Sequence, residues 1–440
     1  MKRAIVIMCV SILVWGCNKK GDSPITIAVK SDSPDIALAQ LYTADTTYTD
    51  SLHQGYSCFT IPACKSGYVT LNLGQSIPLY VESDDSICIK ISVDEVLFSG
   101  LGYEESEFLH SKKKLIDALG FNDPRKIDIA LFSSEPEVFV HKIDSVKRLR
   151  TNQLKEAENL SEPFVLVEQQ LIKYFGVNQL FGYPSFHEML TGSKPSLPNN
   201  YFDFTNSVEP NRAELYQFKD YQQAIRSLLS HRAQTFAQKY ALAKELITDT
   251  SFFEEIMFWD LYSYINFNGT HDIDSICKEF MALQRNGERK EALLTKYQGW
   301  QRLAKGEVAP DFEISNEKGK PVRLSDFRGK VVYIDCWSSF CGPCIAEMPA
   351  MKNLIAAFEG RNVVFISISA DTDTQRWLSK VKEFGLDAVN LCTQGAKHKF
   401  NQDYMAKAFP RYILINSEGI IVNATANKPS EAKLQIEALL

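Results

Sequence analysis

The sequence lacks the features that mark several large classes of protein. Beyond its first 16 residues it has no uninterrupted apolar run of about 18 residues, the length expected of a membrane-spanning helix. The net charge is −6 and no Lys/Arg-rich run occurs beyond residue 20, which argues against nucleic acid as a partner. The seven His residues form no cluster with metal-ligand spacing, so no metal site is expected. What remains is an ordinary globular composition, and 440 residues predict about two or three domains.

The first residues have a pattern of their own. A short basic start precedes an almost unbroken apolar run from Ala4 to Trp15, which is shorter than the roughly 20 residues that span a bilayer. Such a run is typical of a secretory signal. Cys17 and a polar stretch follow, and this junction resembles a bacterial lipoprotein signal. We therefore expect a signal peptide at residues 1–16, a lipid anchor on Cys17, and a periplasmic or outer-membrane lipoprotein of the cell envelope. A plain signal peptide followed by an incidental Cys is the alternative.

Two regions of different period follow this signal. The first carries strand patterns of alternating or β-branched residues, separated by turn formers. From Glu104 the apolar residues recur at helical spacing. The sequence thus predicts a small all-β domain at 17–100 and a mostly helical domain at 101–304. The expected helical stretches are Glu137–Glu158, Pro163–Phe181, Asn211–Ile247, Ser251–Phe267 and Asp272–Lys305, with a loop at Tyr183-Pro184.

In the last part of the chain, at 305–440, strand and helix patterns alternate. Strand–helix–strand order implies parallel neighbours joined by crossovers, and Asn416–Gly419 is a hairpin signal between the last two strands. The sequence therefore predicts an α/β domain here. Its expected strands are 331–334, 363–368, 412–415 and 420–422, with helices at 342–359 and 373–384 between the first three.

Among the ten Cys residues, only Cys341 and Cys344 have motif spacing, and they lie where a strand ends and a helix begins. A thiol at a helix N-terminus is favoured as thiolate, which is the nucleophile in disulfide exchange. Two intervening residues let the second sulfur reach the first. We expect Cys341 to attack a substrate disulfide and Cys344 to resolve the mixed disulfide, so the pair is itself the redox centre and no cofactor is needed. A zinc site would need two further ligands, and a c-type haem site would need His where Ile345 stands.

An acid precedes the dithiol on the incoming strand. Asp335 lies six residues before Cys341, in a position predicted to be buried beneath the thiols. Burial raises the pKa of a carboxyl group, which would suit Asp335 to accept a proton from Cys344. The alternative is an exposed Asp at the end of the strand.

Four segments of this domain together resemble thioredoxin, and more closely the extracytoplasmic thioredoxin-like proteins of the TlpA and ResA type. The resemblance implies a thioredoxin fold for residues 305–440 and thiol–disulfide oxidoreductase activity. The four segments are Gly306–Phe312, Leu324–Lys330, Cys344–Pro349 and Phe409–Ile415.

The resemblance also implies roles for single residues. Pro410 matches a cis-proline that faces the dithiol and holds the Phe409 backbone ready to pair with an extended substrate. Trp337 matches an aromatic residue that shields the site, whereas Phe340 stands where the family usually has Trp. Glu347 matches the family's helix acid, with a solvated helix face as the alternative. Cys341, Cys344, Asp335 and Pro410 are thus the expected catalytic residues, and Trp337, Phe340, Gly342, Pro343 and Phe409 the expected substrate-binding residues.

Gly342 and Pro343 are the residues between the cysteines of thioredoxin, whose potential is about −270 mV. The resemblance therefore implies a reductase, with disulfide-containing envelope proteins as substrates and a membrane thiol donor. Less specifically, the region around Val96–Gly100 resembles the front part of larger thioredoxin-like lipoproteins from Bacteroidetes-type bacteria. Two alternatives stay open. One is a thiol peroxidase, although Ile334 stands where such an enzyme has Pro, and the other is an envelope-binding lipoprotein whose front domains recruit a partner.

The remaining cysteines have no motif spacing. Cys58 and Cys64 flank a turn in the strand-rich region, so a bridge between them is one hypothesis, and buried thiols that act as small apolar side chains are the other. Cys336 follows Asp335 on a predicted core strand and is expected to be a buried neighbour of the site. The sequence does not fix the redox state of Cys58, Cys64, Cys88, Cys277, Cys336 or Cys392.

Overall fold

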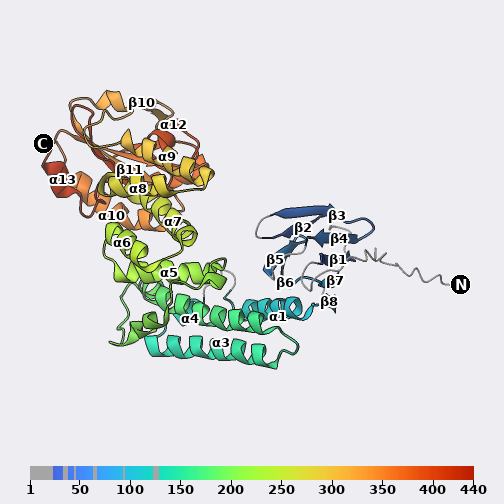
Figure 1. Cartoon of the computed structure of the whole chain (residues 1–440). Coiled ribbons are helices and arrows are strands. Elements are labelled where there is room, and N and C mark those ends of the chain that lie inside the picture. The colour runs from blue at the N-terminus through green and yellow to red at the C-terminus, as the bar shows by residue number, and fades with distance from the viewer. Residues whose placement is uncertain (1–22, 33–37, 44–45, 63–66, 93–94, 122–127) are drawn as a thin grey trace. The chain divides into compact units, whose positions relative to one another are not determined.

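The computed structural model describes residues 23–440 except 33–37, 44–45, 63–66, 93–94 and 122–127 (Figure 1). The expected signal peptide, Cys17 and Cys64 lie outside the described residues, so the lipid anchor and the Cys58–Cys64 bridge stay predictions. No helix in the described part of the chain is long and apolar enough to cross a membrane.

The described residues form two compact units. One holds the residues up to Val208 together with Ala213–Ala224, and the other holds Glu209–Arg212 and Ile225–Leu440. The region predicted to be helical therefore contributes to both units, and its last helices share a unit with the α/β domain. The domain boundaries at 16, 100 and 304 stay predictions.

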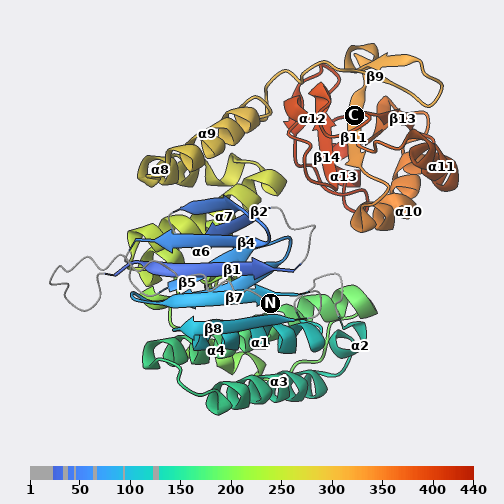
Figure 2. The same ribbon diagram turned by 90° about the vertical axis from the view of Figure 1, so that its right-hand side faces the viewer.

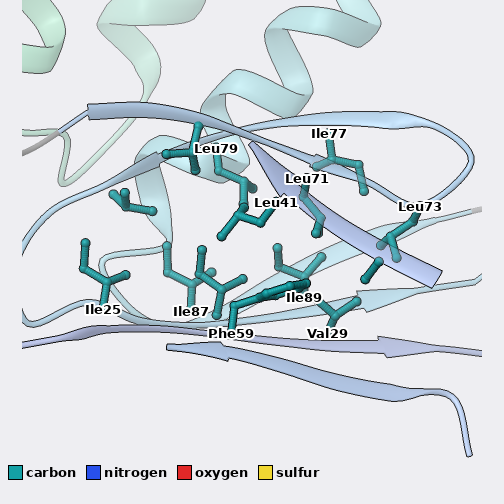
Figure 3. Packing of buried hydrophobic residues seen from close by; sticks show 14 of the residues in the cluster. Ile25, Val29, Leu41, Phe59, Leu71, Leu73, Ile77, Leu79, Ile87 and Ile89 are labelled. Atoms are coloured by element: carbon teal, nitrogen blue, oxygen red, sulfur yellow. The ribbon is translucent and has the colours of Figure 1, made fainter. Parts of the chain in front are cut away.

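The first unit begins with two four-stranded sheets, ordered β4-β1-β7-β8 and β3-β2-β5-β6. Their inward-facing side chains form one apolar core, to which β1 contributes alternate residues such as Ile25 and Val29 (Figure 3). Ile27 pairs with Phe59 on one side and with Ile87 on the other. The predicted all-β region is confirmed. Its strands are β1 Ile25–Ser31, β2 Leu38–Tyr42, β3 Thr47–Ser51, β4 Tyr56–Ile61, β5 Gly67–Asn72, β6 Ser76–Val81, β7 Ser86–Ile91 and β8 Val96–Leu101.

Helices follow the strands, as predicted from their period. Those before the second unit are α1 Glu104–Ala118, α2 Ile129–Phe132, α3 Pro136–Glu156 and α4 Glu162–Thr191, and α5 Lys219–Arg232 extends from one unit into the other. The second unit continues with α6 Phe236–Leu246, α7 Thr250–Asn268, α8 Asp274–Leu283 and α9 Gly287–Gln301.

The loop predicted at Tyr183-Pro184 is wrong, because α4 runs through Pro184. Pro184 has no N–H to give to the carbonyl of Leu180 four residues earlier. That carbonyl instead accepts a hydrogen bond from the Tyr201 hydroxyl at 2.9 Å. Tyr183 is fully buried, with its ring centroid 4.4 Å from that of Phe139 on α3. Tertiary contacts thus compensate for the missing helix hydrogen bond.

Two expected helical stretches are each divided. In the stretch at Asn211–Ile247, a capping box of Thr235 and Gln238 starts α6 as a new helix. In the stretch at Asp272–Lys305, the Asn286 side chain accepts the backbone N–H of Arg289 and so starts α9. Helical period alone does not locate such internal caps.

The last domain has a five-stranded sheet, ordered β13-β12-β11-β14-β15, and a separate β9-β10 hairpin (Figure 2). Its strands are β9 Glu313–Ser315, β10 Pro321–Arg323, β11 Val331–Trp337, β12 Val363–Ser369, β13 Val389–Cys392, β14 Arg411–Ile415 and β15 Ile421–Asn423. Its helices are α10 Gly342–Ala357, α11 Thr374–Phe384, α12 Lys399–Asp403 and α13 Lys433–Glu437. The predicted thioredoxin fold is confirmed.

Two details of this sheet differ from the prediction. β13 was not predicted, because Asn390 interrupts a short apolar run, although all but one of its residues are buried. β14 was expected to lie parallel to its neighbour, yet it pairs with β11 antiparallel. The additional strand β13 is parallel to β12, so the chain passes through it and α12 before returning along β11.

Candidate active site

The dithiol lies between the central strand and the helix that follows it. β11 is buried along its whole length, and Cys341 is the N-cap residue of α10. Cys341 and Cys344 form the predicted disulfide, with their Cα atoms 5.3 Å apart. The Cys341 sulfur also accepts the backbone N–H of Cys344 at 3.2 Å. Cys341 is half-buried whereas Cys344 is 1% exposed, so an incoming molecule reaches Cys341 first.

The peptide bond between Phe409 and Pro410 is cis, as predicted. It lies directly before β14, whose first residue, Arg411, pairs with Cys336 on β11. Phe409 is half-buried and packs against the apolar cluster that contains Cys344. The fold therefore brings the proline strand to the end of β11 from which the dithiol segment departs.

Asp335 is 2% exposed, which confirms its predicted burial and excludes the exposed strand-end alternative. Burial raises the pKa of its carboxyl group to about 8, and the negative charge of Glu347 adds to the rise. Its Oδ1 atom has no hydrogen-bond partner among the described residues. A carboxyl group with a pKa near neutrality can both accept and release a proton there.

Glu347, on α10, is held by the segment after β15. One of its carboxylate oxygens accepts the backbone N–H of Ser430 at 3.2 Å, and the other accepts the Ser430 hydroxyl at 3.3 Å. The Lys428 ammonium nitrogen lies 3.4 Å from Oε1 of Glu347. With a side chain only 19% exposed, Glu347 does not belong to a solvated helix face.

Trp337 was expected to shield the site and to contact substrate. It is 1% exposed and packs in the cluster with Cys344 and Trp377, with its ring edge-on to Phe384. It therefore covers the inner side of the disulfide, and the structure leaves it no exposed surface for a substrate. The two residues between the cysteines, Gly342 and Pro343, are both exposed.

Phe340 is 71% exposed directly before Cys341. The guanidinium carbon of Arg376, on α11, lies 3.6 Å from the centre of the Phe340 ring. No local pattern marks this pair, because its members lie 36 positions apart in the chain and only the fold brings them together.

Sequence analysis also missed Asp371, which is 3% exposed and follows β12. Its carboxylate accepts hydrogen bonds from the Ser339 hydroxyl at 2.9 Å, the Ser339 backbone N–H at 3.0 Å and the Ser369 hydroxyl at 2.7 Å. The Ser338 hydroxyl donates to it at 3.2 Å. The sequence did contain a signal for Asp371, because it is an acid that closely follows a predicted strand. The carboxyl ends of parallel neighbouring strands such as β11 and β12 meet at the same edge of the sheet.

Cys336 and Cys392 lie near the dithiol but differ from Cys341 in exposure. Cys336 is buried, and burial raises the pKa of its thiol. Cys392 is also buried with a raised thiol pKa, and its sulfur donates to the backbone carbonyl of Asp371 at 3.3 Å. Such thiols are poor nucleophiles at neutral pH.

A cavity of about 840 Å³ also lies in the second unit, between the ends of α7 and α9 and the strands β14 and β15. Trp300 and Leu414 are among its walls, and neither the dithiol nor Pro410 lines it. The cavity is therefore separate from the surface at which Cys341 is reached.

Comparison with known proteins bears on this site. The model of the Redoxin family matches residues 304–440. The thiol-disulfide oxidoreductase ResA of Bacillus thuringiensis subsp. konkukian is 29% identical over 150 residues, which are 33% of this chain and 84% of ResA. ResA of Bacillus subtilis is 27% identical over 139 residues, covering 31% of this chain and 76% of the relative.

A similar solved structure is the thioredoxin domain of a thiol-disulfide oxidoreductase from Bacteroides vulgatus. It is 27% identical and covers 31% of this chain and 96% of its own, with a TM-score of 0.29. The family match and the ResA sequences carry the assignment. The C-terminal domain, residues 304–440, belongs to the Redoxin family and is a thiol-disulfide oxidoreductase related to ResA.

Proposed function

We propose that the protein reduces protein disulfides outside the cytoplasm, through the dithiol form of Cys341-Gly342-Pro343-Cys344. The observation that carries this proposal is the unequal exposure of the two cysteines, with Cys341 half-buried at the start of α10 and Cys344 buried behind it. The reachable residue is suited to attack a substrate, and the buried residue is suited to resolve the intermediate.

The proposed reaction has two exchanges. The N-terminus of α10 favours the Cys341 thiolate, which attacks one sulfur of a substrate disulfide and releases the other sulfur as a thiolate. Cys344 then gives its proton to Asp335, and its thiolate attacks the Cys341 sulfur, which breaks the mixed disulfide and releases the second substrate sulfur as a thiolate. Two electrons have passed to the substrate, and the protein is left with the Cys341–Cys344 disulfide. A membrane thiol donor is proposed to reduce that disulfide for the next cycle.

The positions around the dithiol support a polypeptide substrate. Phe409 packs against the cluster that holds Cys344, and its backbone, next to the cis bond before Pro410, is proposed to pair with an extended segment of the substrate. The reducing direction is proposed because Gly342 and Pro343 separate the cysteines as they do in thioredoxin. Envelope proteins with disulfides are the proposed substrates, and the proposed lipid on Cys17 would hold the enzyme among them.

The proposal is tested by reduction of insulin with the chain from residue 18 onward. Wild-type protein should turn over, and Cys341→Ser should lose all turnover because it lacks the attacking thiol. Cys344→Ser should instead accumulate mixed disulfides, since it keeps that thiol and lacks the resolving one. Turnover retained by Cys341→Ser, or a wild-type protein that is inert while both thiols titrate, would contradict the proposal.

A further inference from the structure

An exposed aromatic ring stands next to the attacking cysteine. Phe340 immediately precedes Cys341, and 71% of its surface is open to solvent. A guanidinium group, that of Arg376, covers one face of the ring at 3.6 Å from its centre. Contacts of this kind are favourable and bias the guanidinium toward the ring.

The N–H donors of that guanidinium form no hydrogen bond with any residue that the structure describes. No ion pair between described residues includes Arg376. The nearest acid along α11 is Asp373, whose side chain accepts the backbone N–H of Arg376 at 3.0 Å as the helix cap. Asp371 is buried, and its oxygens are occupied by Ser338, Ser339 and Ser369. A guanidinium that lies against a ring keeps the N–H groups along its edge available for a carboxylate.

The position of Arg376 is tied to the dithiol. The next residue, Trp377, is 3% exposed and packs in the same cluster as Trp337 and Cys344. α11 is thereby anchored to the core beneath the disulfide, and Arg376 is carried on its solvent side. A polypeptide whose disulfide meets Cys341 can therefore contact the Phe340 ring and the guanidinium beside it.

We propose that Arg376, placed over Phe340, is a specificity-determining residue that selects disulfides flanked by an Asp or Glu side chain. This inference rests on the proposed reductase function and names its substrate class. The carboxylate beside the substrate cystine accepts two hydrogen bonds from the guanidinium edge, while an apolar neighbour covers the open part of the Phe340 ring. The bond-forming steps are those already given, with the substrate positioned before Cys341 attacks.

The test uses two synthetic cyclic peptides, each closed by one disulfide, that differ only in Glu or Gln beside one Cys. Reduction of both is measured with the full chain, with Arg376→Gln, and with Lys380→Gln as a matched control. Lys380 lies one turn further along α11 and pairs with Glu383 at 2.8 Å. For the wild type and the control, we expect kcat/KM about tenfold higher for the Glu peptide. For Arg376→Gln we expect a ratio near one, because the rate for the Glu peptide falls toward that for the Gln peptide.

Equal rates for the two peptides with wild-type protein would overturn the inference, and so would a preference that survives Arg376→Gln. Equal slowing of both peptides in Arg376→Gln would also overturn it, because the residue would then act on the thiolate and not on the substrate. Failure of the reductase function itself looks different, since the wild type would then reduce neither peptide.

Discussion

Asp371 accepts the backbone N–H and the hydroxyl group of Ser339, at 3.0 and 2.9 Å, and so fixes the loop that leads into Cys341. The two residues come from the ends of neighbouring parallel strands, β12 and β11. A buried carboxylate that accepts this many hydrogen bonds orders the backbone segment that carries Cys341.

Replacing Asp371 with Asn should therefore loosen the dithiol loop. The NH2 group of Asn would face the hydroxyl and N–H donors from which the carboxylate oxygen now accepts hydrogen bonds, so these hydrogen bonds would be lost. We therefore expect the free energy of unfolding to fall by about 2 kcal/mol. We also expect insulin reduction to slow. Denaturant unfolding and turnover measure the two effects. Asp387→Asn is the control, because Asp387 is exposed and should tolerate the change. A variant as stable and active as the wild type would show that the network does not position the loop.

Asp335 should make the stability of the oxidised protein depend on pH. Its carboxyl pKa is about 8 in the folded protein, against about 3.9 in an unfolded chain. The folded state therefore holds a proton that the unfolded state has lost between these values, and stability should fall as pH rises from about 4 to about 8. Asp335→Asn should flatten this slope in urea unfolding measured across that range. An unchanged slope would mean that Asp335 titrates normally.

The same residue should affect turnover through Cys344. If Asp335 accepts the Cys344 proton, Asp335→Asn should slow resolution of the mixed disulfide by about a hundredfold near pH 7. The attack by Cys341 should change far less. Stopped-flow mixing with a disulfide peptide separates the two phases, and the mixed disulfide should accumulate in the variant. Equal slowing of both phases would assign Asp335 a structural role only.

Tyr201 should stabilise the unit that contains α4. Its hydroxyl group donates a hydrogen bond to the Leu180 carbonyl, which has no helix partner because Pro184 lacks an N–H. Tyr201→Phe should lower the free energy of unfolding of that unit by about 1 kcal/mol and leave insulin reduction unchanged. Tyr42→Phe is the matched control, since the Tyr42 hydroxyl bonds Gln40 at the exposed surface. Equal effects of the two variants would contradict this account of the proline-containing helix.

Local patterns predicted the centre of the site, and contacts between distant segments decided the rest. The Cys pair and the buried Asp335 lie within or beside a single strand, so local patterns revealed them, whereas the cis bond before Pro410 was implied by the resemblance to thioredoxin-like proteins. Asp371 and Arg376 act on residues more than 30 positions away. The order of the strands could have indicated Asp371, but no pattern in the sequence marks the pair of Arg376 and Phe340.

For the fold as well, features set by local patterns were predicted and features set by contacts between distant segments were missed. Strands with continuous apolar runs were found, whereas β13 was missed because Asn390 breaks its short run. The rule that Pro ends a helix failed at Pro184, because a hydroxyl group from outside α4 satisfies the freed carbonyl. A rule based on neighbours in the chain cannot include a partner supplied by packing.

The measurement that tests the central claim most directly is the reduction potential of the Cys341–Cys344 disulfide. The chain is equilibrated with glutathione or dithiothreitol buffers of defined ratio, and the thiols are then counted. A reductase of the proposed kind should give a potential below about −220 mV, near that of thioredoxin. A value above about −150 mV would place the pair among disulfide donors and contradict the proposed direction of electron flow.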